Sequence, residues 1–407
     1  MNQITDSGNS LRPKLVIIVA TKFLLFFRGC ITNLRSDGFD VSTITAPGPE
    51  QESIRAEGAS IFDVAMNREI SPLDDLVSLW RIWRVLRRLR PEITNSGNPK
   101  TGLLGGLAAV LAGVPCRIYT LHGLRLETTT GVKRKILVWA EKIACKCAHR
   151  VICVSPSLRE RAIHLGLVEP AKTVVLAIHG VEIERYAATP DNLATADKLR
   201  SELNLPKDHL VIGFVGRFTR DKGIPELMEA YWALRRDFPG LRLLLVGDFE
   251  DGDPVPQSLR TRIESDPLIL RPGFVPDTSV YYQLMDVLVL PTWREGLPTV
   301  NIEAQAAGKP VVTTRATGAI DSVQDGKTGL LVPVGDASAL ARAVGSLLSD
   351  NAKRKEMGRR GQEWVTREFP QGKMLPALTR EYHSLILEKL GPRCSQVANG
   401  GAIGRKR

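Results

Sequence analysis

The sequence LVLPTWREGLPTVNIEAQAAGKP, residues 288 to 310, carries the most informative pattern of the chain. It continues an apolar run, Val287 to Leu290, which is typical of a buried strand and which ends at Pro291. After a short polar loop, Pro298 is expected at the first position of a helix, because its fixed φ is already helical. The pattern predicts a strand, a loop and a helix, and ligands of open α/β sheets bind at loops of this kind.

Polar groups suited to a ligand surround this predicted turn. Glu295 lies in the loop and Glu303 inside the helix, with seven residues between them. Gly296 allows the backbone to approach a ligand closely. Amides at the helix start can point at an anion, and these belong to Leu297, Thr299 and Val300. An ordinary βα unit whose two glutamates are merely solvated would have the same sequence pattern. A second stretch is therefore needed to distinguish a ligand-binding loop from an ordinary one.

The second stretch is VIGFVGRFTRDKG, residues 211 to 223. It predicts a buried strand, a helix from about Ile224 and, between them, a loop that contains Gly216, Arg217, Arg220 and Lys222. A diphosphate requires fixed cations and close backbone approach, which a cationic loop with glycine provides. Together the two stretches predict one site with cations for a diphosphate, amides at a helix start and carboxylates for hydroxyl groups.

These motifs resemble those of the retaining GT-B glycosyltransferases known as group 1. The resemblance rests on the spaced glutamates, the preceding strand and LPT, and the upstream VGR and KG. Within that group the chain is most similar to bacterial enzymes that add sugars to polyprenyl-diphosphate-linked intermediates of capsule, lipopolysaccharide O-antigen or glycan assembly. The similarity extends from about Lys14 to Leu390. It implies hexosyl transfer from a nucleotide-sugar, with a UDP-sugar expected, and retention of the anomeric configuration.

The resemblance also implies an α/β fold of the GT-B architecture, in which two Rossmann-like domains face each other across a cleft. The polar stretch 187 to 208 is the best candidate boundary between them. The expected parts are an acceptor-binding domain 1–190, a nucleotide-sugar-binding domain 191–370, a helix 371–390 that crosses back to the first domain, and a disordered basic tail 391–407.

The resemblance assigns catalytic roles to Arg217, Lys222, Glu295 and His122. The two cations would neutralise the departing diphosphate where other enzymes use a metal, so no metal or other cofactor is expected. Glu295 would hold hydroxyl groups of the sugar. His122, at the carboxyl end of a strand from Arg117 to Leu121, would lie near the transferred sugar, and a structural histidine is the alternative.

Further residues are implied for the donor. Glu303 would accept hydrogen bonds from ribose hydroxyl groups, and the backbone near Val275 would meet the edge of the base. The full donor-binding set consists of Gly216, Arg217, Lys222, Val275, Glu295, Gly296, Leu297, Thr299, Val300 and Glu303.

Two N-terminal residues are candidates for binding the acceptor. The apolar run Leu15 to Phe27 is too short to span a bilayer, and it predicts a strand, Leu15 to Ala20, that leads into a helix ending near Ser36. In the resembled family the intervening loop approaches the donor or the acceptor, which makes Gly29 a candidate. Lys100 is expected at a helix start, as an anion contact or as an ordinary exposed lysine.

Composition indicates a globular protein with an anionic partner. The 407 residues suffice for two or three domains, and 43% hydrophobic and 24% charged residues are typical of globular chains. A net charge of +11 favours a nucleotide-sugar, a nucleic acid or an acidic membrane surface. Six cysteines in so long a chain fit a reducing cytoplasm better than a disulfide framework.

One predicted helix suggests a membrane location. LDDLVSLWRIWRVLRRLR, Leu73 to Arg90, is basic and amphipathic and contains two tryptophans. The helix either covers the sheet, with its arginines in solvent, or faces anionic lipid headgroups. Both can be true, because one face can pack on the sheet while the arginines of another face reach the lipid. With a polyprenyl-linked acceptor, the expected location is cytoplasmic and peripheral on the inner face of the plasma membrane.

Two stretches imitate metal sites. In CKCAHRVIC, residues 145 to 153, the first three candidate ligands lie where a helix ends and point in divergent directions. The DGD at 251 to 253 lies in a proline-rich loop without a third ligand. No metal site is expected.

Two other classes remain open. A basic nucleic-acid-binding protein would bind tightly and in a salt-sensitive manner, although the chain lacks aromatics interleaved on a basic strand face. A nucleotide-sugar-processing enzyme of the same fold, such as an epimerase, would turn over the donor with no acceptor present.

Overall fold

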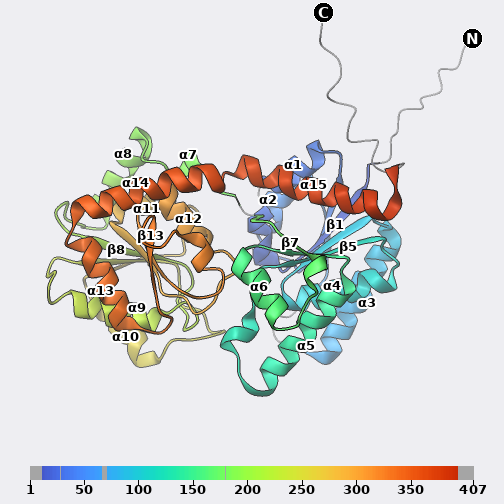
Figure 1. The fold of residues 1–407 in the computed structure, drawn as a ribbon, viewed down its shortest axis with the longest axis horizontal. Helices are drawn as coiled ribbons and strands as arrows, with labels where there is room; N and C mark the ends of the chain where they lie inside the picture. Colours follow the sequence, from blue (N-terminus) through green and yellow to red (C-terminus); the bar gives the residue numbers. More distant parts are fainter. Residues whose placement is uncertain (1–11, 28, 67–70, 179, 393–407) are drawn as a thin grey trace, which may run out of the picture.

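The computed structural model describes residues 12–27, 29–66, 71–178 and 180–392. Within these ranges the chain forms two parallel β-sheets, each covered by helices (Figure 1). The predicted α/β class is confirmed. The tail predicted to be disordered spans residues 391–407. Residues 393–407 lie outside the described ranges, so the structure does not test this prediction.

The first sheet has seven strands in the order β3-β2-β1-β4-β5-β6-β7. Their side chains are largely buried on both faces, which explains why the strands read as apolar runs. The strands are β1 Lys14–Ile18, β2 Asp40–Thr45, β3 Ser60–Asp63, β4 Ile93–Gly97, β5 Cys116–Leu121, β6 Arg150–Cys153 and β7 Thr173–Val175.

Helices cover both faces of this sheet. The helices are α1 Cys30–Ser36, α2 Gln51–Ala56, α3 Pro72–Leu89, α4 Pro99–Leu111, α5 Gly131–Cys147, α6 Pro156–His164 and, from the end of the chain, α15 Gln371–Leu390. Figure 1 shows α3, α4 and α5 on one side of the sheet and α1 and α15 on the other.

The predicted single helix after β1 is wrong. A 3₁₀ segment spans Thr21–Phe27, and α1 begins separately at Cys30 after Gly29, whose φ is +73°. A positive φ interrupts a right-handed helix and is readily adopted by glycine, so the chain changes direction there.

The second sheet has six strands in the order β10-β9-β8-β11-β12-β13. They are β8 Val211–Val215, β9 Arg242–Val246, β10 Ile269–Gly273, β11 Val287–Leu290, β12 Val311–Thr314 and β13 Gly329–Val332. The helices of this half are α7 Ile183–Tyr186, α8 Pro190–Glu202, α9 Ile224–Leu234, α10 Gln257–Ser265, α11 Ser279–Leu284, α12 Thr299–Ala306, α13 Ala337–Leu348 and α14 Asn351–Glu368.

Each sheet contains one point where the strand order reverses. In the first sheet it lies between β1 and β4, and in the second between β8 and β11. Ligands of open α/β sheets bind outside the carboxyl ends of the strands at such points. The two motif-bearing loops follow β8 and β11, so the topology brings them to one edge.

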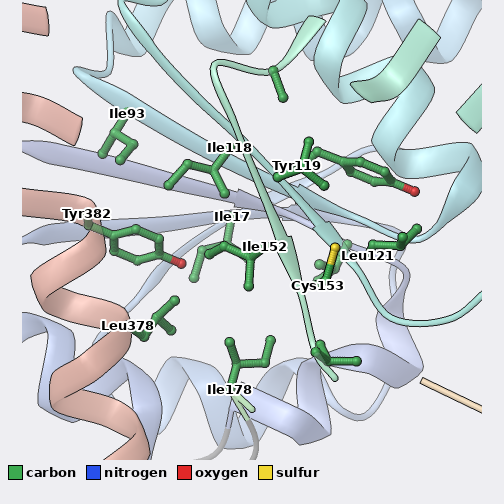
Figure 2. Packing of buried hydrophobic residues seen from close by; sticks show 14 of the residues in the cluster. Ile17, Ile93, Ile118, Tyr119, Leu121, Ile152, Cys153, Ile178, Leu378 and Tyr382 are labelled. Carbon is green, nitrogen blue, oxygen red and sulfur yellow. The ribbon is translucent and has the colours of Figure 1, made fainter. Parts of the chain in front are cut away.

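The last helix, α15, packs against the first domain. Leu378, Tyr382 and Leu385 are buried in the core of that domain, and Figure 2 shows Leu378 and Tyr382 beside the sheet. Asn95 of β4 donates its side-chain N–H to the Tyr382 hydroxyl oxygen at 2.6 Å. Arg150 forms ion pairs with two glutamates of α15, among them Glu388 at 2.7 Å.

The two segments that connect the domains lie side by side. The Val181 N–H donates to the Phe369 carbonyl at 2.9 Å, and the Gln371 N–H donates to the Val181 carbonyl at 3.1 Å. A Cβ at Gly180 would lie 2.4 Å from the Gln371 Cα, so a side chain there has no room. The domains are therefore joined by two paired crossings.

A buried acid lies between β5 and α5. The Tyr119 hydroxyl donates to Glu141 Oε2 at 2.7 Å, and each residue is 1% exposed. Burial raises the pKa of Glu141 to about 7, although the hydrogen bond from Tyr119 opposes the rise. The carboxyl group is therefore protonated in the folded chain at pH values where it is ionised in the unfolded chain.

The substitution Leu385→Ala is expected to lower the free energy of unfolding by about 2–5 kcal/mol, because it leaves a cavity in the core. Leu387→Ala, two residues away at a side chain that is 48% exposed, is the matched control and should change it by less than about 0.5 kcal/mol. Urea unfolding followed by circular dichroism measures both. Equal effects would contradict the docking of α15.

The substitution Glu141→Gln tests the raised pKa. Between about pH 4.5 and pH 7 the unfolded wild-type chain loses this proton and the folded chain keeps it, so wild-type stability falls as pH rises. Glutamine does not titrate. The stability of the variant relative to wild type should therefore increase by on the order of 3 kcal/mol across this range, measured by urea unfolding at a series of pH values. Parallel pH profiles would show that Glu141 is not protonated in the fold.

Candidate active site

The loops after β8 and β11 are in direct contact. Gly223 ends the first loop with a φ of +74°, and a Cβ there would lie 2.0 Å from the carbonyl oxygen of Pro291, where the second loop begins. Only a residue without a side chain fits this approach. Gly216, at the end of β8, has a φ of +146°, and its N–H donates to the Val246 carbonyl at 2.9 Å.

Lys222 and Glu295 form an ion pair between these two loops. Their side chains are 18% and 13% exposed, so the pair is mostly shielded yet accessible to a ligand. Arg217 pairs with Glu250 in the loop after β9 and is 43% exposed. The structure therefore brings three of the predicted catalytic residues to the carboxyl edge of the second sheet.

A second ion pair, which the sequence analysis missed, supports the first. Arg294 Nη2 donates to Asp221 Oδ2 at 2.6 Å, and the Asp221 side chain is 7% exposed. Burial alone would raise the pKa of Asp221, but Arg294 and a hydrogen bond from Thr219 hold it below its ordinary value. Asp221 and Arg294 are the immediate neighbours of Lys222 and Glu295, so this pair fixes both loops.

The site lies at the boundary between the domains. Arg294 Nε donates to the Thr128 hydroxyl of the first domain at 2.9 Å. Thr317 of the second domain donates its hydroxyl to Glu127 Oε1, also at 2.9 Å. Glu127 additionally accepts a hydrogen bond from Arg161. These contacts show that the carboxyl edges of the two sheets meet.

His122 lies against the same boundary. A Cβ on Gly296 would lie 2.1 Å from the His122 carbonyl oxygen, and a Cβ on Gly123 would lie 3.3 Å from the Gly296 nitrogen. The His122 ring packs against Phe23 with 5.3 Å between the ring centroids. The structure thus brings the predicted N-terminal candidate beside the loop that carries Glu295.

Glu303 is held within α12 by an aromatic cluster. The Tyr282 hydroxyl donates to Glu303 Oε2 at 2.6 Å. Burial raises the pKa of the Glu303 carboxyl, although the Tyr282 hydroxyl opposes the rise. The helix begins at Thr299, and Pro298 precedes it with an extended ψ of 104°. The prediction of Pro298 as the first helical residue is therefore wrong by one position.

The side chains of the other donor candidates pack within the protein. Leu297 and Val300 pack their side chains against the core clusters, which anchors the start of α12. Thr299 is partly buried at the first helical position. Val275 follows β10 and packs against the second domain, while the neighbouring Phe274 is 72% exposed.

The two predicted acceptor residues are engaged elsewhere in the first domain. Lys100 forms an ion pair with Asp75 of α3 at 2.5 Å. The Gly29 N–H donates to Glu57 Oε1 at 2.8 Å. Gly29 follows β1 and Lys100 follows β4, at the reversal point of the first sheet. Neither carboxylate partner was identified from the sequence.

The described part of the chain contains no cluster of three or more histidine, cysteine or acidic residues suited to a metal ion. Arg117 lies beside His149, with 3.1 Å between Nη2 and Nε2. Cys145 and Cys153 are buried, and burial raises the pKa of each thiol. Among the same residues, no helix is long and apolar enough to cross a membrane.

Comparison with known proteins identifies the family. Residues 26–179 match the family model described as a glycosyl transferase 4-like domain, and residues 195–364 match that of the glycosyl transferases group 1. Over 378 residues the chain is 35% identical to the capsular polysaccharide biosynthesis glycosyltransferase CapM of Staphylococcus aureus, covering 92% of this chain and 98% of that protein. This chain belongs to the group 1 glycosyltransferases.

Two further comparisons extend this result. This glycosyltransferase is 29% identical over 321 residues to the Escherichia coli UDP-Gal:alpha-D-GlcNAc-diphosphoundecaprenol alpha-1,3-galactosyltransferase, covering 78% of this chain and 82% of that protein. Among solved structures, Anabaena HepE in complex with UDP and glucose aligns with a TM-score of 0.77 at 20% identity, covering 91% of this chain and 100% of that one. The predicted GT-B fold is confirmed.

The substitution Gly296→Ala is expected to disturb the domain boundary of this glycosyltransferase, because the new Cβ would overlap the His122 carbonyl. We expect stability to fall by about 1–3 kcal/mol in urea unfolding. Gly372→Ala, where a Cβ would meet nothing within 4 Å, is the control and should leave stability unchanged or raised. Equal behaviour of the two variants would contradict the close backbone approach.

Proposed function

We propose that this glycosyltransferase moves a sugar from a nucleotide-sugar, with UDP as the expected nucleotide, to a polyprenyl-diphosphate-linked saccharide, and that the anomeric configuration is retained. The product would serve bacterial surface polysaccharide assembly. The names of the two relatives, a capsular polysaccharide enzyme and a galactosyltransferase acting on a diphosphoundecaprenol, support this acceptor class. The complexes of HepE with UDP and UDP-glucose support the donor class.

The observation that carries the proposal is the Lys222–Glu295 pair at the reversal point between β8 and β11. When the anomeric bond breaks, negative charge develops on the departing diphosphate. The Lys222 ammonium group would leave Glu295 and pair with the diphosphate, and Arg217 would add a second cation. The amides at the start of α12, of Thr299 and Val300, would contribute their dipoles.

The remaining residues would position the donor. Glu295, once released from Lys222, would accept hydrogen bonds from sugar hydroxyl groups. Glu303 would accept those of the ribose, in place of or beside the hydroxyl of Tyr282. The backbone at Val275 would meet the base. His122 would approach the transferred sugar from the first domain, where its contact with Gly296 already brings the two domains together.

The first domain would bind the acceptor. Gly29 and Lys100 follow β1 and β4, at the reversal point of the first sheet, and would contact the acceptor diphosphate if Lys100 exchanges Asp75 for it. Because that acceptor carries a polyprenyl chain, the enzyme would act in the cytoplasm, peripherally on the inner face of the plasma membrane. Two fixed cations at the leaving group would make a divalent ion unnecessary.

The variants Lys222→Ala and Glu295→Gln are expected to reduce transfer by about 10²–10³-fold each, because each removes a group that binds the reacting donor. Purified protein is incubated with UDP-sugars and a lipid-linked saccharide extract, and products are identified by mass spectrometry. Lys327→Ala, at an exposed lysine between β12 and β13, is the control and should retain wild-type rates. Circular dichroism verifies that all variants fold.

Several results would contradict the proposal. Near-wild-type transfer by both variants would remove the assigned roles of Lys222 and Glu295. Loss of turnover on chelation, with recovery on adding manganese, would show that a metal is required. Donor turnover without acceptor would indicate an epimerase-type enzyme. The proton coupling of the product's anomeric carbon in NMR reports whether configuration is retained.

A further inference from the structure

The exposed apolar side chains of the chain are concentrated on one side of the first domain. Nine of the fourteen large apolar side chains exposed in the described ranges belong to α3, α4 and α5. These helices pack side by side on one face of the seven-stranded sheet (Figure 1). Grouped exposed apolar residues mark a surface that contacts a partner or a membrane.

On α3 the exposed residues form one stripe. The apolar part, which is 46% to 81% exposed, consists of Leu73, Leu76, Val77 and Trp80. These positions repeat with the spacing of one helix face, and the opposite face is buried against the sheet. The stripe continues into basic side chains, since the Arg84 guanidinium lies 4.6 Å from the centroid of the Trp80 ring.

The helix α5 repeats this arrangement. Val132, Ile136 and Trp139 share one face and are exposed by 73%, 45% and 69%. Lys142 and Lys146 follow on the same face, three and seven residues after Trp139, and both are exposed. On α3 the exposed apolar side chains lie in the first half of the helix and the exposed arginines in the second half. On α5 exposed cations lie at both ends: Lys133, Arg134 and Lys135 beside the first apolar residues, and Lys142 and Lys146 after them.

The two apolar stripes lie at the same end of the domain. In a parallel sheet every connecting helix starts at the carboxyl edge of the strands. The ion pair of Lys100 with Asp75 confirms that the first turns of α4 and α3 are adjacent. The stripes thus flank the start of α4, on the edge that meets the second domain. The first-turn cations of α5 lie at that same edge, and the remaining exposed cations lie farther from it.

The charge of this region is strongly one-sided. Within α3 and α5, nine lysines and arginines are exposed, and Asp74 is the one exposed acid of these two described helices. We propose that the exposed side chains of residues 73–88 and 132–146, the α3/α5 surface, bind an anionic lipid bilayer. The tryptophans and aliphatic residues enter the headgroup boundary, and the cations contact lipid phosphates.

Other occupants fit the surface less well. A second copy would oppose two sets of cations, which repel each other. A nucleic acid would use the cations but would gain little from exposed aliphatic side chains such as Leu73 and Val132. The proposal rests on the proposed function, in which the acceptor is lipid-linked, and it identifies the surface of the chain that binds the bilayer. Its test needs neither donor nor acceptor.

The experiment is sedimentation of the full chain with sucrose-loaded vesicles of phosphatidylcholine, with or without phosphatidylglycerol. The wild type should bind the anionic vesicles preferentially, and binding should weaken as salt rises. The pair Leu73→Glu and Trp139→Glu, and separately the pair Arg84→Glu and Lys142→Glu, should each lower the binding constant by at least about tenfold.

Matched controls change the same chemistry on other surfaces. Leu193→Glu with Leu387→Glu replaces residues that are 47% and 48% exposed, and Lys327→Glu with Lys355→Glu reverses exposed lysines of the second domain. Equal losses in the controls, or no wild-type binding to anionic vesicles, would overturn the proposal. A dimer abolished by the first pair in analytical ultracentrifugation, or DNA binding without vesicle binding, would also overturn it. Transfer to a soluble acceptor, unaffected in all variants, tests the enzymatic proposal separately.

Discussion

The arrangement of this glycosyltransferase depends on a backbone contact between its two domains. The chain at His122 and Gly123 touches the chain at Glu295 and Gly296, and a Cβ on Gly318 would lie 2.3 Å from the Gly296 carbonyl oxygen. Three glycines at one boundary allow two parallel sheets to meet at their carboxyl edges. Because helix starts and strand ends gather at these edges, the contact brings polar groups of both domains to one place.

The charged side chains at this boundary form ion pairs with one another. Lys222 is paired with Glu295 and Asp221 with Arg294, within loops that the β8–β11 neighbourhood brings together. Under the proposed function, a bound diphosphate would therefore exchange one partner of Lys222 for another, instead of neutralising an isolated cation. The neighbouring Asp221–Arg294 pair would keep the loop geometry during such an exchange, since Arg294 also donates a hydrogen bond across the boundary to Thr128.

The sequence predicted the strands and the two loops well, because buried parallel strands are apolar throughout and glycine and proline mark their ends. It did not reveal Glu250, Asp75 or Asp221 as partners of the basic residues. Such pairs join segments whose proximity follows from strand order, which local patterns do not encode. Likewise, the apolar run after β1 suggested a continuous helix, whereas the positive φ of Gly29 depends on tertiary packing.

The return of α15 to the first domain has a consequence for how the chain is made. A ribosome releases the first sheet long before Leu378, Tyr382 and Leu385, which complete its core. Until then, apolar groups of β1, β4 and β5 on that face lack their cover, and Asn95 lacks the Tyr382 hydroxyl. The core of the first domain is thus completed only when α15 has been made, and a chain that ends anywhere before residue 371 has a first domain with an open core.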